Sequence, residues 1–138
     1  KKRCKSFHEH NEDMASKEII RYIKDNKVVS ILSDAGTPAV SDPGYKLIRE
    51  CYKSSIAYTL LPGPSSVISA LIMSGLPTDK FTFCGFVPKK MNEQKICFDA
   101  LKNEDKTAIF FESPRRIEKT IIHLVLLATG KCCNTLHL

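Results

Sequence analysis

The chain has 138 residues, of which 43% are hydrophobic and 26% are charged, and its formal net charge is +6. This composition is typical of a globular protein with a buried core, and the longest apolar run falls short of the ~18 residues that span a membrane. The positive charge favours an anionic partner, most commonly nucleic acid, although a cationic surface that only maintains solubility gives the same balance. The basic start at Lys1–Lys5 is followed by no apolar region, so we expect no signal peptide.

The six cysteines form no CxxC pair and are mostly scattered singly through predicted elements. This spacing argues against a zinc site or a disulfide framework. We therefore expect free thiols, no metal and a reducing, cytoplasmic location.

The first half of the chain predicts helices alternating with strands. Spacing of Ala15, Ile19 and Ile23 indicates an amphipathic helix over 12–25, with Asn11 as its N-cap. Short apolar runs then predict buried strands at 28–32 and 56–61. A helix over 45–52 lies between these strands, and we expect Ser41 or Asp42 to cap it, with Pro43 at its first position.

The second half continues in the same way. An apolar helix over 67–74 ends at Gly75, and the segment 76–80 is the best candidate for a linker. The remaining pattern predicts a strand at 81–87, a helix beyond the basic loop 88–95, a strand at 106–111, and a helix from 117 that ends at Gly130. Alternating strands and helices predict an α/β architecture with mainly parallel sheets, divided near residue 78 into two groups.

Two loops rich in glycine and proline, residues 33–44 and 62–66, follow the first two predicted strands. The carboxyl ends of parallel strands meet at one sheet edge, so these loops should lie side by side there and bind a mid-sized ligand of mixed polarity. Asp34 and Gly36 favour a functional interpretation, whereas Asp42 in Asp-Pro-Gly is typical of a helix cap. Standard dinucleotide, P-loop, nucleophile-elbow and zinc-protease motifs do not occur in the sequence.

Six motifs in order carry a family resemblance: SFHEHNE (6–12), SDAGTP with SDPGY (33–45), LPGPSS (61–66), SGLP (74–77), GFVPKK (85–90) and FFESPRR (110–116). In these motifs the chain resembles the small-subunit ribosomal RNA methyltransferases of the tetrapyrrole methylase superfamily. The resemblance implies a two-domain α/β fold with the cofactor between the domains, usually as a homodimer. Residues 1–78 resemble the later part of the N-terminal domain and residues 79–138 the first part of the C-terminal domain.

The same resemblance implies transfer of a methyl group from S-adenosylmethionine to a cytidine ribose 2′-oxygen in small-subunit rRNA. Implied cofactor contacts are Asp34, Ala35, Gly36, Thr37, Pro62, Gly63, Pro64 and Ser65. Implied contacts to rRNA phosphates are Lys89, Lys90, Arg115 and Arg116, with a solvated loop as the alternative for the two lysines. Glu112 is a candidate for orienting groups or accepting a proton, and His8 and His10 are further candidate bases.

The chain also departs from the family pattern. Arg115 stands where the family usually has histidine, and the family's first strand and the strand after the last helix have no counterpart here. These departures indicate a partial chain.

Two other functions fit parts of the pattern. One is methylation of a corrin or siroheme precursor, because the superfamily shares the fold. The other is a non-catalytic binding or scaffold fragment, which the missing family segments favour. His8 and His10 with Glu9 and Glu12 form only a weak metal-like cluster that suits a polar cap or a substrate contact equally well.

Overall fold

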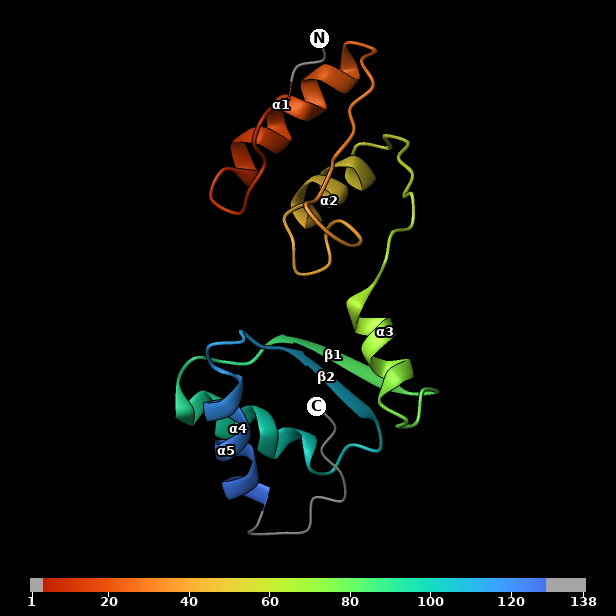
Figure 1. Cartoon of the computed structure of the whole chain (residues 1–138). Helices are drawn as coiled ribbons and strands as arrows, with labels where there is room; N and C mark the ends of the chain where they lie inside the picture. Colours follow the sequence, from red (N-terminus) through yellow and green to blue (C-terminus); the bar gives the residue numbers. More distant parts are fainter. Residues whose placement is uncertain (1–3, 129–138) are drawn as a thin grey trace. The chain divides into compact units, whose positions relative to one another are not determined.

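The computed structural model describes residues 4–128 (Figure 1). Contacts divide the chain into two compact units, Lys1–Ser65 and Ser66–Leu138. This division assigns the segment after Ser65 to the second unit, whereas the sequence predicts a domain limit near residue 78. The boundary near residue 78 refers to the two domains of the complete family fold, and it stays a prediction.

The first unit contains two helices packed against each other, α1 (Glu12–Lys24) and α2 (Tyr45–Lys53). Both confirm helices predicted from the sequence. Helix α1 begins with two acidic residues and ends with Arg21 and Lys24, so its charges complement the helix dipole. In α2, Leu47 and Cys51 are buried on the inner face, as their spacing of one helical turn requires.

A buried carboxylate joins the two helices. Glu12 is 6% exposed, and its Oε1 accepts hydrogen bonds from the backbone N–H of Gly44 (2.8 Å) and of Lys46 (3.1 Å). These groups lie at the start of α2, where N–H donors have no partner within the helix. The Lys46 ammonium also contacts Asp13, and that hydrogen bond raises the pKa of Lys46. The beginning of α1 therefore caps the beginning of α2.

The predicted cap of α2 is wrong. Gly44, with φ of 142°, occupies the N-cap position and no local side chain caps the helix. Ser41 (φ 57°) has left-handed backbone and Asp42 has no recorded cap bond, because the carboxylate of Glu12 takes their place. Asn11 does occupy the N-cap position of α1, but its side chain donates to Ser6 O and accepts from His8 N instead.

The predicted strands at 28–32 and 56–61 are also not formed. Among residues 4–128 the sheet contains two strands, both from the second unit. A strand requires a neighbour for its backbone groups, and neither segment has one there. Several of their apolar side chains are exposed, including Val28 (96%), Leu32 (87%) and Leu61 (83%).

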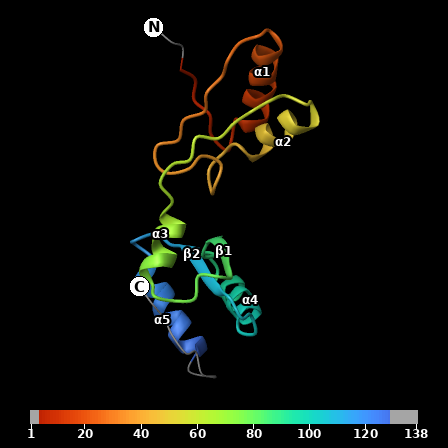
Figure 2. The same cartoon turned by 90° about the vertical axis from the view of Figure 1, so that its right-hand side faces the viewer.

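The second unit contains α3 (Ser66–Met73), β1 (Phe81–Phe86), α4 (Met91–Leu101), β2 (Thr107–Phe111) and α5 (Ile117–Ala128). The two strands are parallel and α4 crosses between them, which confirms the predicted strand–helix–strand order. Figure 2 shows the same elements after a quarter turn. Within the described residues no helix is both long enough and apolar enough to cross a membrane.

The core of this unit follows the alternation of side chains along β2. Ile109 packs with Val67 and Leu71 of α3, and Phe83 and Phe111 pack against this cluster. Phe110, pointing the opposite way, meets Phe98 of α4 edge to face with centroids 5.7 Å apart. Each face of the short sheet is therefore covered by a different helix.

Two glycines shape the ends of these elements. Gly75 has φ of +69° after the end of α3 and confirms the predicted helix stop. Gly85 has the same φ inside β1, where the register with β2 shifts between Phe83 and Phe86. The shift is a bulge, and glycine accepts its left-handed backbone without a steric penalty.

The described cysteines Cys4, Cys51, Cys84 and Cys97 are free thiols, and burial raises the pKa of Cys51 and of Cys84. Cys132, Cys133 and the helix stop predicted at Gly130 lie outside the described residues.

We predict that Glu12→Ala destabilises the first unit by about 1–3 kcal/mol, because two N–H groups, one of them buried, lose their acceptor. Glu12→Gln retains an acceptor oxygen and should lose less. The control is Asp13→Ala, which removes an adjacent exposed carboxylate whose ion pair with Lys46 contributes little. Urea denaturation measures the difference, and equal effects of the two alanine variants would contradict this role for Glu12.

Candidate functional site

The two glycine- and proline-rich loops lie side by side in the first unit, as predicted. Thr37 Oγ1 lies 3.2 Å from Gly63 O and 3.5 Å from Pro64 O, and it donates to these carbonyls. Within the first loop, Ser33 Oγ lies within hydrogen-bond distance of Ala35 O and Gly36 O. These side-chain donors hold both loops although the strands expected beneath them are not formed.

The close approach of the loops requires glycine. A Cβ on Gly63 would lie 2.9 Å from Gly36 O, a distance that real Cβ atoms essentially never show. Gly36 has φ of +73°, and a Cβ there would lie 3.3 Å from Pro64 O. A side chain at either position would force the backbones apart. The sequence placed these glycines correctly in turns, but their mutual contact is a finding of the structure.

The paired loops present mainly backbone groups and one carboxylate. Asp34, Ala35 and Gly36 are exposed, and so are Pro62, Gly63 and Pro64; Thr37 and Ser65 are half-buried. Carbonyl and carboxylate oxygens favour a ligand with positive charge, whereas backbone N–H groups bind polar edges. This combination suits the mid-sized ligand of mixed polarity that the sequence predicts.

His8 and His10 lie in the turn before α1. Their rings are exposed and meet edge to face, with centroids 6.1 Å apart. Because Glu12 binds the backbone at Gly44, this turn lies near the end of loop 33–44. No group of three or more potential metal ligands occurs within residues 4–128.

Glu112 lies at the end of β2 in the second unit, with its side chain 4% exposed. Its Oε2 accepts from Thr120 Oγ1 (2.7 Å) and pairs with Arg116 Nη2 (3.1 Å), and its Oε1 accepts from Ser113 N (2.7 Å). Arg116 Nη2 also donates to Val87 O and Pro88 O. The carboxylate and guanidinium therefore tie the end of β1 to the start of α5.

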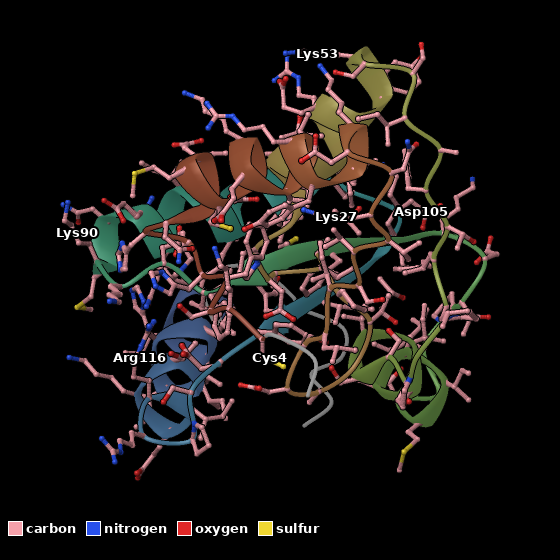
Figure 3. The ribbon with its side chains drawn as sticks, turned by 90° about the horizontal axis from the view of Figure 1, so that it is seen from above. Cys4, Lys27, Lys53, Lys90, Asp105 and Arg116 are labelled. Carbon is pink, nitrogen blue, oxygen red and sulfur yellow. The ribbon has the colours of Figure 1, made fainter. Side chains whose placement is uncertain are left out.

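The other basic side chains around this network face solvent. Lys89, Lys90 and Arg115 are exposed, and Lys90 pairs with Glu93 at 3.1 Å. Ser113 Oγ accepts from Arg115 N, and Ser113 O accepts from Arg116 N and Ile117 N, so Ser113 begins the turn that leads into α5. Figure 3 labels Lys90 and Arg116, which precede α4 and α5. The structure thus brings basic residues from two sequence motifs to one end of the second unit.

Sequence reasoning missed two sets of polar residues. In the sequence Glu12 belongs only to a weak metal-like cluster, and its acidic position in the first turn of α1 does not indicate a partner 32 residues away. Gln94, Thr120 and His123 were also missed. A polar threonine between apolar positions of a helix could have indicated a buried hydrogen bond at Thr120.

Comparison with known proteins gives matches along most of the chain. Residues 1–129 match the family of tetrapyrrole (corrin/porphyrin) methylases. A protein of Thermotoga maritima named ribosomal RNA small subunit methyltransferase I is 44% identical over 121 residues, covering 88% of this chain and 54% of the relative. A protein of Mesorhizobium japonicum with the same name is 43% identical over 131 residues, covering 95% of this chain and 45% of the relative.

The chain therefore spans about half the length of the curated relatives it matches. Its match to the family extends through both compact units and includes both candidate loops and the Glu112 network. On these grounds the chain belongs to the tetrapyrrole methylase family.

Proposed function

We propose that this chain serves an S-adenosylmethionine-dependent methyltransferase that modifies a cytidine ribose 2′-oxygen in small-subunit rRNA. Family membership and the names of the relatives support methyl transfer and an rRNA substrate. The observation that carries the cofactor role is the pairing of the two loops through Thr37, Gly36 and Gly63. A cytoplasmic location, expected from the scattered cysteines, and a homodimer, implied by the family resemblance, belong to the same proposal.

In this proposal the paired loops hold the cofactor, which supplies an electrophilic methyl group on a positively charged sulfonium. The Asp34 carboxylate and the loop carbonyls attract that charge. The implied contacts are Asp34–Thr37 and Pro62–Ser65, where the exposed backbone leaves room for a ligand. Their fixed geometry lowers the entropic cost of aligning two reactants.

The ribose hydroxyl must also lose a proton. We assign Glu112 an orienting role, one of the two expected for it, because its carboxylate already accepts from Ser113 and Thr120 and pairs with Arg116. His8 and His10 are exposed and stay candidate proton acceptors. Lys89, Lys90 and Arg115 present positive charge to rRNA phosphates, and Arg116 combines such a contact with its structural bonds.

Two alternative functions can be distinguished from this one. A corrin or siroheme precursor as substrate is disfavoured by the basic net charge and by the rRNA-directed names of the relatives. A non-catalytic fragment would give no thermal shift with S-adenosylmethionine, because the shift requires an assembled binding site.

We predict that Asp34→Ala weakens S-adenosylmethionine binding about fivefold, the effect of losing roughly 1 kcal/mol of exposed charge attraction. Gly36→Ala should weaken it further, because a side chain there strains a φ of +73° and crowds Pro64 O. Asp42→Ala, in the same loop and also exposed, is the matched control. Isothermal calorimetry checks these values, and affinities equal to the parent's in both test variants would refute the assignment.

We predict that Lys90→Ala and Arg115→Ala each reduce the salt dependence of rRNA binding. Each lost phosphate contact should lower the slope of log K against log salt by about 0.7 for single-stranded RNA. Lys80→Ala removes an exposed charge just before β1, at the opposite end of that strand, and should leave the slope unchanged. Fluorescence anisotropy over a salt series measures the slopes, and an unaltered slope in both test variants would exclude the phosphate role.

A further inference from the structure

A cavity of about 410 Å³ lies between α4 and α5 in the second unit. None of the expected cofactor contacts lines it. Lys89 and Arg116, two of the implied rRNA contacts, do line it, together with residues of α4 and α5 outside the six sequence motifs. Its volume falls within the range of pockets that hold small organic groups.

The cavity is lined by three cationic side chains, Lys89, Arg116 and Lys119, and by no acidic one among the described residues. Lys89 and Lys119 make no ion pair with any residue from 4 to 128 that the structure records. Arg116 is 31% exposed although its Nη2 is bonded to Glu112 and two carbonyls. The charge of Arg116 is compensated by Glu112, but the charges of Lys89 and Lys119 are not, and they favour an anionic ligand.

The cavity also has apolar walls. Met91 is 53% exposed and Ile122 is 55% exposed, and both line the cavity, one from each helix. A ligand that is only a phosphate gains nothing from such walls. A planar ring carrying phosphates uses both the walls and the cations.

Gln94 and His123 determine which edge of a bound base the cavity can accept. Gln94 Nε2 donates to Pro88 O at 2.8 Å, so its Oε1 faces His123 Nδ1, 2.6 Å away. Because an amide oxygen only accepts, Nδ1 must carry the proton. In the neutral ring Nε2 is then an acceptor, which matches an exocyclic amino group.

We propose that this cavity is a nucleotide subsite for single-stranded RNA. It takes one unstacked base that bears an amino group, cytosine or adenine, between Met91 and Ile122. The flanking phosphates lie on Lys89, Arg116 and Lys119. This inference rests on the proposed rRNA substrate and adds a base contact to the phosphate contacts already proposed for Lys89 and Arg116.

The test uses the full chain and two fluorescein-labelled 12-nucleotide RNAs, oligo(C) and oligo(U), which carry equal charge. Anisotropy should show oligo(C) bound about threefold to fivefold more tightly, the effect of one additional base contact. His123→Phe should remove this preference while retaining a ring of similar shape. Ile122→Ala should weaken oligo(C) about fivefold without changing its salt slope.

Phosphate contact is tested separately. Lys119→Ala should lower the salt slope by about 0.7, whereas Lys80→Ala, the matched charge loss at the far end of β1, should not. Circular dichroism confirms that each variant is folded.

Three results would overturn the subsite: no preference for oligo(C), parental affinity in both the Ile122 and His123 variants, or polyphosphate competing as well as oligo(C). The first two with intact rRNA methylation by the complete protein would remove the subsite and leave the proposed function standing. If oligo(C) binding depends on the cavity but the complete protein does not methylate rRNA, the subsite stands and the proposed function fails.

Discussion

The first unit depends on one buried carboxylate. Glu12 satisfies two backbone N–H groups at the start of α2, which no nearby side chain caps. Buried backbone donors without partners are costly, so this contact fixes where loop 33–44 ends. Thr37 then joins that loop to Gly63 and Pro64. Three separate sequence motifs are connected by this short chain of hydrogen bonds.

The second unit uses a related arrangement at the end of its sheet. Glu112 and Arg116 together bind Thr120 and the backbone at Val87 and Pro88. Because Gln94 also donates to Pro88, the segment leaving β1 is held from both flanking helices. These bonds hold Arg116 next to the segment that carries Lys89 and Lys90, so basic residues of two motifs lie together.

Local patterns in the sequence predicted much of this structure. Among residues 4–128, the five helices, the parallel pair β1 and β2 and the stop at Gly75 all follow from spacing and turn chemistry. The sequence also predicted that loops 33–44 and 62–66 lie side by side, although the strands on which this prediction was based are not formed.

Partners distant in sequence were not predictable in the same way. The apolar, β-branched pattern of 28–32 indicates that its side chains favour a strand, but it does not indicate whether a neighbouring strand is available. The acceptor for the N–H groups at the start of α2 comes from Glu12, and the partner of Gln94 Oε1 is His123, 29 residues further along the chain. Each of these contacts depends on the packing of separate elements, which periodicity within one element does not encode.

We propose that the paired loops form the cofactor-binding surface of this chain. The most direct measurement is a titration of the ¹⁵N-labelled chain with S-adenosylmethionine, followed by amide correlation spectra. We expect saturable shifts concentrated at the amides of Asp34–Thr37, Gly63 and Ser65, with the amides of β1 and α4 unchanged. Shifts confined to the second unit, or no shifts at saturating cofactor, would contradict it.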